Sequence, residues 1–144
     1  GTNDLAKDMQ FRVTSDRHVR RDGMLYALSK MVTAARAYNI GVLDGVFNDI
    51  ADLDGLGQEC EHGTALGFDG KTLIHPNQIE TANTLFAPTS EEISEAEHII
   101  NAFENPENAG KGVIQVNGKM TELLHLEQAK RIVAIVAAIK LMET

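Results

Sequence analysis

The chain of 144 residues lacks several features that would assign a protein to a class at once. Cys60 is its one cysteine, so no internal disulfide can form, and we expect a cytoplasmic protein. No uninterrupted apolar run is long enough to cross a bilayer. Cationic residues are few, because 13 Lys and Arg face 21 Asp and Glu and give a net charge of −8. This balance argues against nucleic acid or an anionic membrane as the main partner.

Common catalytic signatures are missing as well. The sequence has no glycine-rich phosphate loop, no Cys and His at metal-binding spacing, and no Ser in a nucleophile elbow. It opens on Gly1-Thr2-Asn3-Asp4 without Met and without a strand ahead of it. This opening is typical of the loop that leaves a strand, so we expect the chain to be a fragment.

Alternating apolar patterns are present in the first part of the chain. Apolar residues at helical spacing predict a helix over 24–38, and near-continuous apolar character predicts a buried strand over 40–47. Next come a helix over 55–66, broken by Gly63 and Gly67, and a strand over 71–75. Another helix then reaches Phe86. This order predicts α/β units with right-handed crossovers and a parallel sheet.

The character of the sequence changes at Pro88. Thr89 and Glu92 have the spacing of a capping box and begin a helix that ends before Pro106. Asn117-Gly118 predicts a tight hairpin between residues 113–116 and 119–121, and a last helix covers about 124–142.

Two strands cannot close a barrel, because a complete (β/α)₈ barrel takes roughly 250 residues. We therefore expect residues 1–87 to be an incomplete portion that needs neighbouring strands and helices. Residues 88–144 are expected to form an extension packed outside it.

Asp4 stands where a strand exit would bring a carboxylate to the ligand-binding edge, and carboxylate oxygens suit Mg²⁺. The commoner explanation is that Asn3 or Asp4 caps a helical turn. Asp44 interrupts an apolar strand, so it is either a functional carboxylate or half of a structural ion pair.

His75-Pro76 ends the second strand, and Asn77 is placed to cap the next helix. His75 would face the ligand edge or be an ordinary core histidine. Glu122 follows the hairpin turn and is either an acid on a lid or an exposed Glu near a helix start. Residues 6–22 form a predicted loop whose arginines would bind phosphate or, more commonly, face solvent: Arg12, Arg17, Arg20 and Arg21.

Six segments, in this order and spacing, resemble the C-terminal half of the citrate lyase β-subunit and malyl-CoA lyase family. They are Gly1-Thr2-Asn3-Asp4-Leu5, Ala34-Ala35-Arg36-Ala37, Leu43-Asp44-Gly45-Val46-Phe47-Asn48-Asp49, Leu66-Gly67-Phe68-Asp69-Gly70-Lys71, Ile74-His75-Pro76-Asn77-Gln78-Ile79 and Asn117-Gly118-Lys119-Met120. The resemblance implies a TIM (β/α)₈ barrel, of which residues 1–87 would be the last βα units, with residues 88–144 as a C-terminal lid and oligomerisation extension. It implies assembly into trimers or hexamers. It also implies a Mg²⁺-assisted reaction of an acyl-CoA or carrier-protein thioester through an enolate.

The resemblance implies a role for individual residues. Asp4 matches the second of two acidic metal ligands, and Glu122 stands where most members have an Asp that covers a neighbouring subunit's site. The backbone around Thr2 and Asn3 would lie beside the substrate carboxylate. The acyl and pantetheine region would be lined by Asp44, Gly45, Val46, Phe47, His75 and Pro76.

Three functions follow as expectations. The first is a C-terminal portion of a CoA-ester lyase that cleaves or forms a C–C bond in malyl-CoA or a citryl thioester. The second is a malyl-CoA thioesterase on the same scaffold, and the third is a non-catalytic oligomerisation or lid module. Because the other metal-binding Glu and the substrate-binding Arg of the family lie upstream, we expect the missing N-terminal half as a partner.

Overall fold

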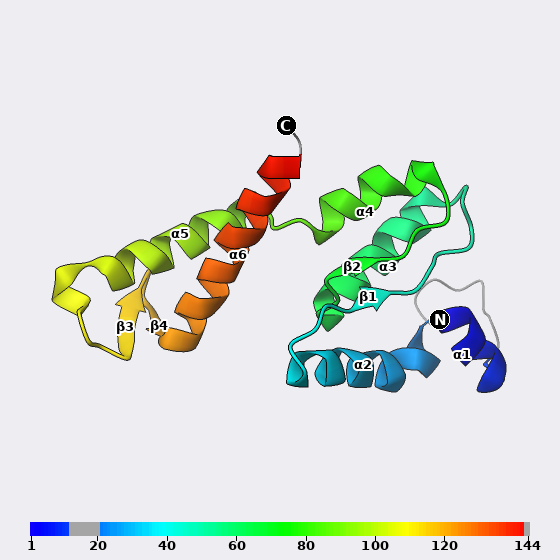
Figure 1. Ribbon diagram of the computed structural model, residues 1–144, viewed down its shortest axis with the longest axis horizontal. Helices are drawn as coiled ribbons and strands as arrows, with labels where there is room; N and C mark the ends of the chain where they lie inside the picture. The colour runs from blue at the N-terminus through cyan, green and yellow to red at the C-terminus, as the bar shows by residue number, and fades with distance from the viewer. Residues whose placement is uncertain (12–20, 143–144) are drawn as a thin grey trace. The chain divides into compact units, whose positions relative to one another are not determined.

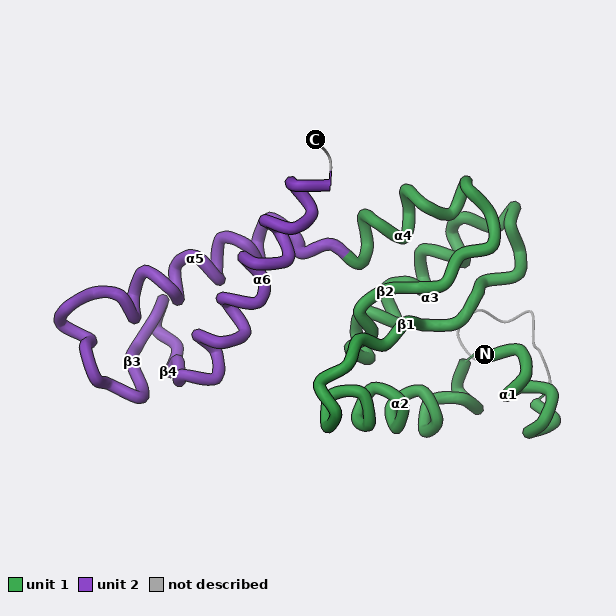
Figure 2. The backbone as a smooth tube through the Cα atoms, viewed as in Figure 1, with its two compact units in different colours: residues 1–86 green, residues 87–144 purple. Residues whose placement is uncertain are grey.

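The structure is a computed structural model that describes residues 1–11 and 21–142. It divides into two compact units, Gly1–Phe86 and Ala87–Thr144 (Figure 2). The division falls one residue from the predicted boundary, whereas the identities of the two parts as barrel portion and extension stay predictions. Arg12, Arg17 and Arg20 lie outside the described residues. In the described ranges, no helix combines the length and apolar character needed to span a membrane.

Unit 1 alternates helices with very short strands (Figure 1). Its elements, including the 3₁₀ turns η1 and η2, are α1 (Thr2–Asp8), η1 (Asp22–Met24), α2 (Leu25–Ala37), β1 (Leu43–Asp44), α3 (Leu53–Leu66), β2 (Gly70–Lys71), η2 (Pro76–Gln78) and α4 (Ile79–Phe86). The expected loop over 6–22 is therefore wrong at both described ends, because α1 and η1 reach into it.

The two strands form a parallel pair joined by α3, as the sequence predicted. Leu43 lies opposite Gly70 and Asp44 lies opposite Lys71. Both strands are shorter than the predicted ranges 40–47 and 71–75. Beyond Asp44 and Lys71 the backbone also bonds to side chains. The Phe47 carbonyl accepts a hydrogen bond from the Gln78 side chain, and the Ile74 N–H donates one to the same side chain. The ladder ends because these groups have other partners.

Helix α3 covers the strand pair and contributes to the core. Asp52 caps its start by accepting the Gly55 N–H at 2.9 Å, and Gly67 ends it at a φ of 93°. The predicted interruption at Gly63 is wrong, because the helix continues through this residue. The core of unit 1 is a cluster of Phe47, Leu56, Cys60 and Ala82, with Leu73, Leu85 and Phe86 packed against it.

Arg36, near the end of α2, ties the starts of both strands together. Its guanidinium nitrogens Nη1 and Nη2 donate to the two Asp69 carboxylate oxygens at 3.0 and 2.8 Å, and Nη2 also donates to the Gly67 carbonyl at 2.6 Å. Asp69 Oδ2 in turn accepts the Val42 N–H at 2.8 Å. This Arg36 clamp fixes the segments that lead into β1 and β2.

Unit 2 contains two antiparallel strands between two longer helices. Its elements are α5 (Ser90–Glu104), the 3₁₀ turn η3 (Pro106–Asn108), β3 (Val113–Val116), β4 (Lys119–Glu122) and α6 (Leu123–Met142). The predicted capping box is confirmed: the Glu92 N–H donates to Thr89 Oγ1 at 3.2 Å, and the Thr89 N–H donates to Glu92 Oε2 at 2.8 Å.

The predicted hairpin turn of unit 2 is confirmed too. Asn117 and Gly118 both have positive φ angles, 49° and 78°, which a two-residue hairpin turn of the primed type requires. Val116 pairs with Lys119 across the turn. Helix α6 then packs along α5 (Figure 1).

Candidate functional site

The carboxyl ends of β1 and β2 lie at the same edge, because the strands are parallel. Gln78, which is fully buried, joins the two exits by donating from Nε2 to the Phe47 carbonyl at 3.0 Å and accepting the Ile74 N–H at 3.1 Å. Asn77 adds a bond from Nδ2 to the Ile50 carbonyl at 2.8 Å. Ligands of open α/β sheets bind at this edge, so it is the first place to look for a site.

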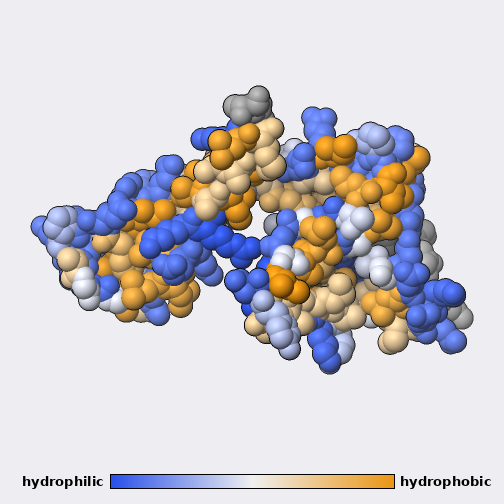
Figure 3. Space-filling model, viewed as in Figure 1, coloured by the Kyte–Doolittle hydropathy of each residue, from blue (hydrophilic) through white to orange (hydrophobic). Residues whose placement is uncertain are grey.

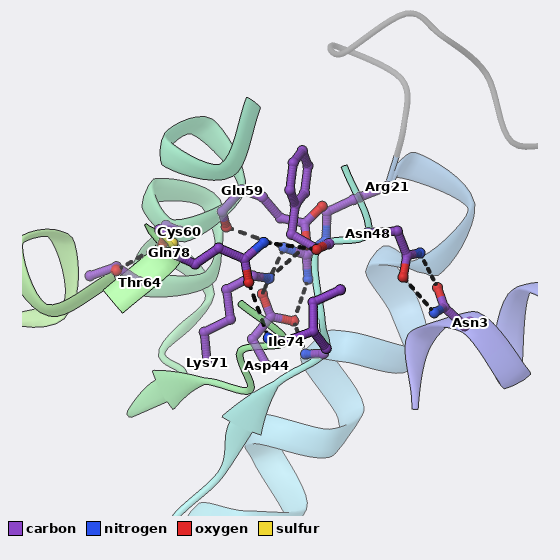
Figure 4. Close-up of polar contacts among 12 residues, drawn as sticks. Asn3, Arg21, Asp44, Asn48, Glu59, Cys60, Thr64, Lys71, Ile74 and Gln78 are labelled. Atoms are coloured by element: carbon purple, nitrogen blue, oxygen red, sulfur yellow. Dashed lines mark hydrogen bonds and ion pairs between the residues drawn. The ribbon is translucent and has the colours of Figure 1, made fainter. Parts of the chain in front are cut away.

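Helix α1 reaches the same edge. The Asn3 and Asn48 side-chain amides bond to one another twice, with nitrogen to oxygen distances of 3.1 and 2.9 Å (Figure 4). Thr2 lies against Gly45 so closely that a Cβ on Gly45 would overlap the Thr2 side chain. Glycine is therefore required at position 45, immediately after β1, for α1 to approach.

A pocket of about 240 Å³ opens where these segments meet. Its lining combines apolar and polar side chains from α1, η1, the β1 exit and α3: Thr2, Asn3, Ala6, Arg21, Met24, Val46, Phe47, Asn48, Asp49 and Glu59. Of the residues proposed for substrate binding, Thr2, Asn3, Val46 and Phe47 come together here. Phe47 is also part of the core and is only 3% exposed.

Asp44 is the centre of a buried ion network beside this pocket (Figure 4). Arg21 grips both of its carboxylate oxygens, with Nη2 to Oδ1 at 2.7 Å and Nη1 to Oδ2 at 2.9 Å. Lys71 Nζ lies 3.1 Å from Asp44 Oδ2 and 2.6 Å from Glu59 Oε1. Two cations thus neutralise two carboxylates, which is what burial of charge demands.

The network decides between the two alternatives for Asp44. Its side chain is 0% exposed and does not line the pocket, so the expectation that it contacts the acyl group is not met. Asp44 has the geometry of a structural ion pair. The expected solvent-facing role of Arg21 is also wrong, because its guanidinium is committed to Asp44 and to the Glu59 carbonyl at 3.3 Å and is not free to bind a phosphate.

Four residues here were not among the predicted site residues: Asn48, Glu59, Lys71 and Gln78. Arg21 was predicted only as one of four arginines that bind phosphate or face solvent. One signal could have identified part of the network: Asp44 and Lys71 are opposite charges on two otherwise apolar strands, and they turn out to be register partners. Nothing in the sequence separates Arg21 from its three neighbouring arginines.

Two titratable side chains of α3 lie close to the network. Burial raises the pKa of the Cys60 thiol above its ordinary value of 9.0, with Lys71 opposing the shift. Burial lowers the pKa of His62 below 6.5, and the nearby Arg21 lowers it further. Cys60 is 0% exposed, so neither its accessibility nor its protonation makes it a nucleophile.

Asp4 lies in the first turn of α1, where its side chain is 86% exposed. Capping by Asn3 or Asp4 is wrong, because the helix begins at Thr2 with Gly1 as the N-cap residue and no side chain caps it. Within residues 1–11 and 21–142, no three His, Cys, Asp or Glu side chains are grouped so that they could hold a metal. The Asp4 carboxylate is a suitable donor for Mg²⁺, but one donor is not a site.

His75 is exposed and precedes the turn after β2. Its Nδ1 lies 2.7 Å from Asn77 Oδ1 and 3.2 Å from the Asn77 backbone nitrogen. The shorter contact needs a proton on Nδ1 and the longer one needs a lone pair there, yet either tautomer ties the ring to Asn77. The core-histidine alternative is wrong, and His75, not Asn77, is the residue that caps the turn begun by Pro76.

Glu122 ends β4 in unit 2 and is half-buried. Its backbone N–H donates to His125 Nδ1 at 2.9 Å, so an imidazole caps the start of α6 beside it.

Comparison with known proteins relates the chain to a group of enzymes. It is 48% identical over 139 residues to a (3S)-malyl-CoA thioesterase of Cereibacter sphaeroides, covering 96% of this chain and 47% of that protein. It is 40% identical over 117 residues to the mitochondrial citramalyl-CoA lyase of Mus musculus, covering 81% and 35%. The chain therefore spans about half the length, or less, of these curated relatives.

The fold agrees with a solved structure. A CitE protein from Mycobacterium tuberculosis, in complex with magnesium, acetoacetate and coenzyme A, superposes with a TM-score of 0.72 at 26% identity. The match covers 88% of this chain and 46% of that one. The sequence profile of the HpcH/HpaI aldolase/citrate lyase family matches residues 1–76, which include α1, β1, β2 and the pocket. The chain belongs to the HpcH/HpaI aldolase/citrate lyase family.

Proposed function

We propose that the chain supplies the C-terminal part of a CoA-ester lyase that cleaves or forms a C–C bond in a hydroxyacyl thioester such as malyl-CoA or a citryl thioester. The observation that carries the proposal is the junction of α1 with the β1 exit at one pocket, inside the residues that match the family. Relatives named as acting on malyl-CoA and citramalyl-CoA support the substrate class.

The proposal includes a barrel completed by residues outside this chain. Leu43 of β1 and Ile74 after β2 are 59% and 51% exposed, although they adjoin the sheet. Figure 3 shows hydrophobic side chains on the surface of unit 1. A parallel sheet needs cover on both faces, so further strands and helices of a TIM barrel would bury this surface.

Each predicted site residue receives a role within the proposal. Thr2, Asn3, Val46 and Phe47 line the pocket that takes the acyl group and the adjoining thioester arm, and Gly45 leaves room for α1. His75 and Pro76 border the second strand exit. Asp44 has an indirect role, because its carboxylate orients Arg21, which lines the pocket.

The proposal includes a bound Mg²⁺ ion. Asp4 would provide one carboxylate ligand, and residues upstream of this chain would provide the others. Bound there, the ion would stabilise negative charge on the substrate carbonyl. Glu122 would transfer a proton at a neighbouring subunit's site, in a trimer or hexamer whose lid is unit 2. The longer Glu side chain, in place of Asp, displaces its carboxylate by about one C–C bond, which affects rate or outcome.

The thioesterase is a second candidate, and the 48% identity to a (3S)-malyl-CoA thioesterase specifically favours it. The products separate the two reactions. A lyase converts malyl-CoA to acetyl-CoA and glyoxylate, whereas a thioesterase adds water and releases malate and free CoA thiol.

The test is incubation of the intact protein that contains this chain with (3S)-malyl-CoA. Glyoxylate is measured as its phenylhydrazone and free CoA with a thiol reagent, in parallel. Glyoxylate without thiol supports the lyase, and thiol without glyoxylate supports the thioesterase. If none of the hydroxyacyl-CoA substrates tried yields either product, both candidate functions are overturned.

The 144-residue chain alone is expected to be inactive, because no three of the described His, Cys, Asp and Glu side chains are grouped so that they could hold a metal. The measurement is acyl-CoA turnover by the purified chain, before and after addition of the upstream half. Turnover by the chain alone contradicts the expectation, whereas activity restored by mixing supports a divided active site.

A further inference from the structure

The Asn3 and Asn48 side chains form a closed amide pair. Asn3 Nδ2 donates to Asn48 Oδ1 at 3.1 Å, and Asn48 Nδ2 donates to Asn3 Oδ1 at 2.9 Å. The pairing is self-complementary, since rotating both amides together preserves both hydrogen bonds. It links residues 45 positions apart in the sequence (Figure 4).

This amide pair is the direct polar link between α1 and the rest of unit 1, as far as residues 1–11 and 21–86 are concerned. The other backbone and side-chain hydrogen bonds of α1 in that part stay within residues 1–11. Packing contributes as well, through Thr2 against Gly45 and through the buried Ala6. Packing against a glycine permits sliding, whereas two opposed hydrogen bonds define a register.

The pair fixes the first turn of α1, which carries Asp4 one residue after Asn3. At the other end, Asn48 follows Val46 and Phe47 on the β1 exit, which line the pocket. A hydrogen bond at an exposed position contributes little to global stability. Its effect is therefore expected in the local order of α1 and in the placement of Asp4.

We infer that Asn3 and Asn48 are positioning residues: their amide pair sets the distance between the Asp4 turn and the pocket wall formed by the β1 exit. The inference rests on the proposed function for its effect on turnover. The ordering of α1 by the pair is independent of that function.

The experiment uses the intact protein with the variants Asn3→Ala, Asn48→Ala and the double variant. Asn83→Ala, at an exposed position of α4, is the matched control. Hydrogen exchange of the amides from Leu5 to Asp8 is expected to accelerate roughly three- to tenfold in each single variant. The double variant should show no further acceleration, because either substitution already breaks both bonds.

Turnover of malyl-CoA gives the second measurement. The expected result is a kcat reduced roughly three- to tenfold in each single variant, again without additivity in the double variant, while the control matches wild type. A purely structural role would instead lower the folded fraction and leave kcat per folded molecule unchanged.

Unchanged exchange in α1 would overturn the inference outright. Accelerated exchange with undiminished kcat overturns the positioning role in the reaction. If wild type itself turns over no hydroxyacyl-CoA, the proposed function fails, while accelerated exchange in α1 still supports the ordering role of the pair.

Discussion

The two units are stabilised in different ways. Unit 1 contains four of the buried polar or charged residues described, Arg21, Asp44, Lys71 and Gln78, and each has a hydrogen-bond partner far away in the sequence. Unit 2 contains one among its described residues, Thr121. Its helices and hairpin are instead defined by local motifs and by apolar packing of α5 on α6.

The difference teaches where each unit is vulnerable. A buried charge network fails when one partner is removed, because the remaining charges stay desolvated. Local motifs fail gradually, one cap or turn at a time. Four substitutions test this contrast.

The largest effect is expected from Asp44→Asn. Asparagine keeps the size of Asp44 but leaves Arg21 and Lys71 buried without their shared carboxylate, which should lower the free energy of unfolding of unit 1 by about 3–5 kcal/mol. Urea denaturation measures the change. The control Asp8→Asn, at an exposed position at the end of α1, should leave the free energy of unfolding unaltered. An equal loss of stability in unit 2 of the Asp44→Asn variant would contradict the contrast between the units.

Gly63→Ala is the next largest. A Cβ at Gly63 would lie 3.1 Å from Asp44 Oδ2 and 3.3 Å from the Phe86 ring, so crowding should cost unit 1 about 1–2 kcal/mol. Gly57 in the same helix is the control, since its Cβ would meet Leu85 at an ordinary 3.7 Å. Gly57→Ala should stabilise unit 1 by about 0.5–1 kcal/mol through helix propensity. Thermal unfolding should therefore show a lower Tm for Gly63→Ala and a higher Tm for Gly57→Ala than for wild type.

Thr89→Ala removes the capping box of α5 in unit 2. The expected cost is about 1 kcal/mol, and it should appear as faster hydrogen exchange at the start of α5 with unit 1 unchanged. Ser94→Ala, exposed within the same helix, serves as the control. A cost spread over both units contradicts the view that unit 2 depends on local motifs.

The smallest effect concerns pH and His62. Because burial holds its pKa below 6.5 in the folded protein, neutral His62 contributes stability above pH 6.5, and this contribution is lost as the pH falls through the lowered pKa. His62→Gln should therefore flatten the acid side of the stability curve of unit 1. Its control is His98→Gln at an exposed position of α5, and identical curves for wild type and His62→Gln would refute the expectation.

Local signals were predictable from the sequence. The capping box of Thr89 and Glu92 and the Asn117-Gly118 turn contain their own hydrogen-bond partners or backbone requirements within a few residues. The order of elements and the parallel pairing of β1 and β2 also followed from periodicity and from the crossover helix between them.

Long-range polar contacts were not predictable. The bond between Arg21 and Asp44 spans 23 residues, and its first partner lies in a stretch that looked like a solvated loop. The apolar run over 40–47 suggested a long strand, yet Phe47 is buried by turning into the core and bonding to Gln78. Apolar character indicates burial without specifying the backbone that achieves it.

The candidate site shows the same limit. Thr2, Asn3, Val46 and Phe47 line one pocket, and family resemblance had grouped them. Asp44 was grouped with them by position, but its side chain points into the charge network. Because β1 ends at Asp44, Val46 and Phe47 lie beyond the strand, where the backbone no longer follows the alternation of side chains that a longer strand would impose.

The Arg36 clamp gives the two ends of the strand pair unequal freedom to change. At the starts of β1 and β2, one guanidinium holds Asp69 and Gly67 and so fixes the geometry independently of any ligand. At the exits, short loops carry the residues that face the pocket. New substrate preferences can therefore evolve through substitutions in the exit loops alone, because the Arg36 clamp keeps the strand pair in place from its other end.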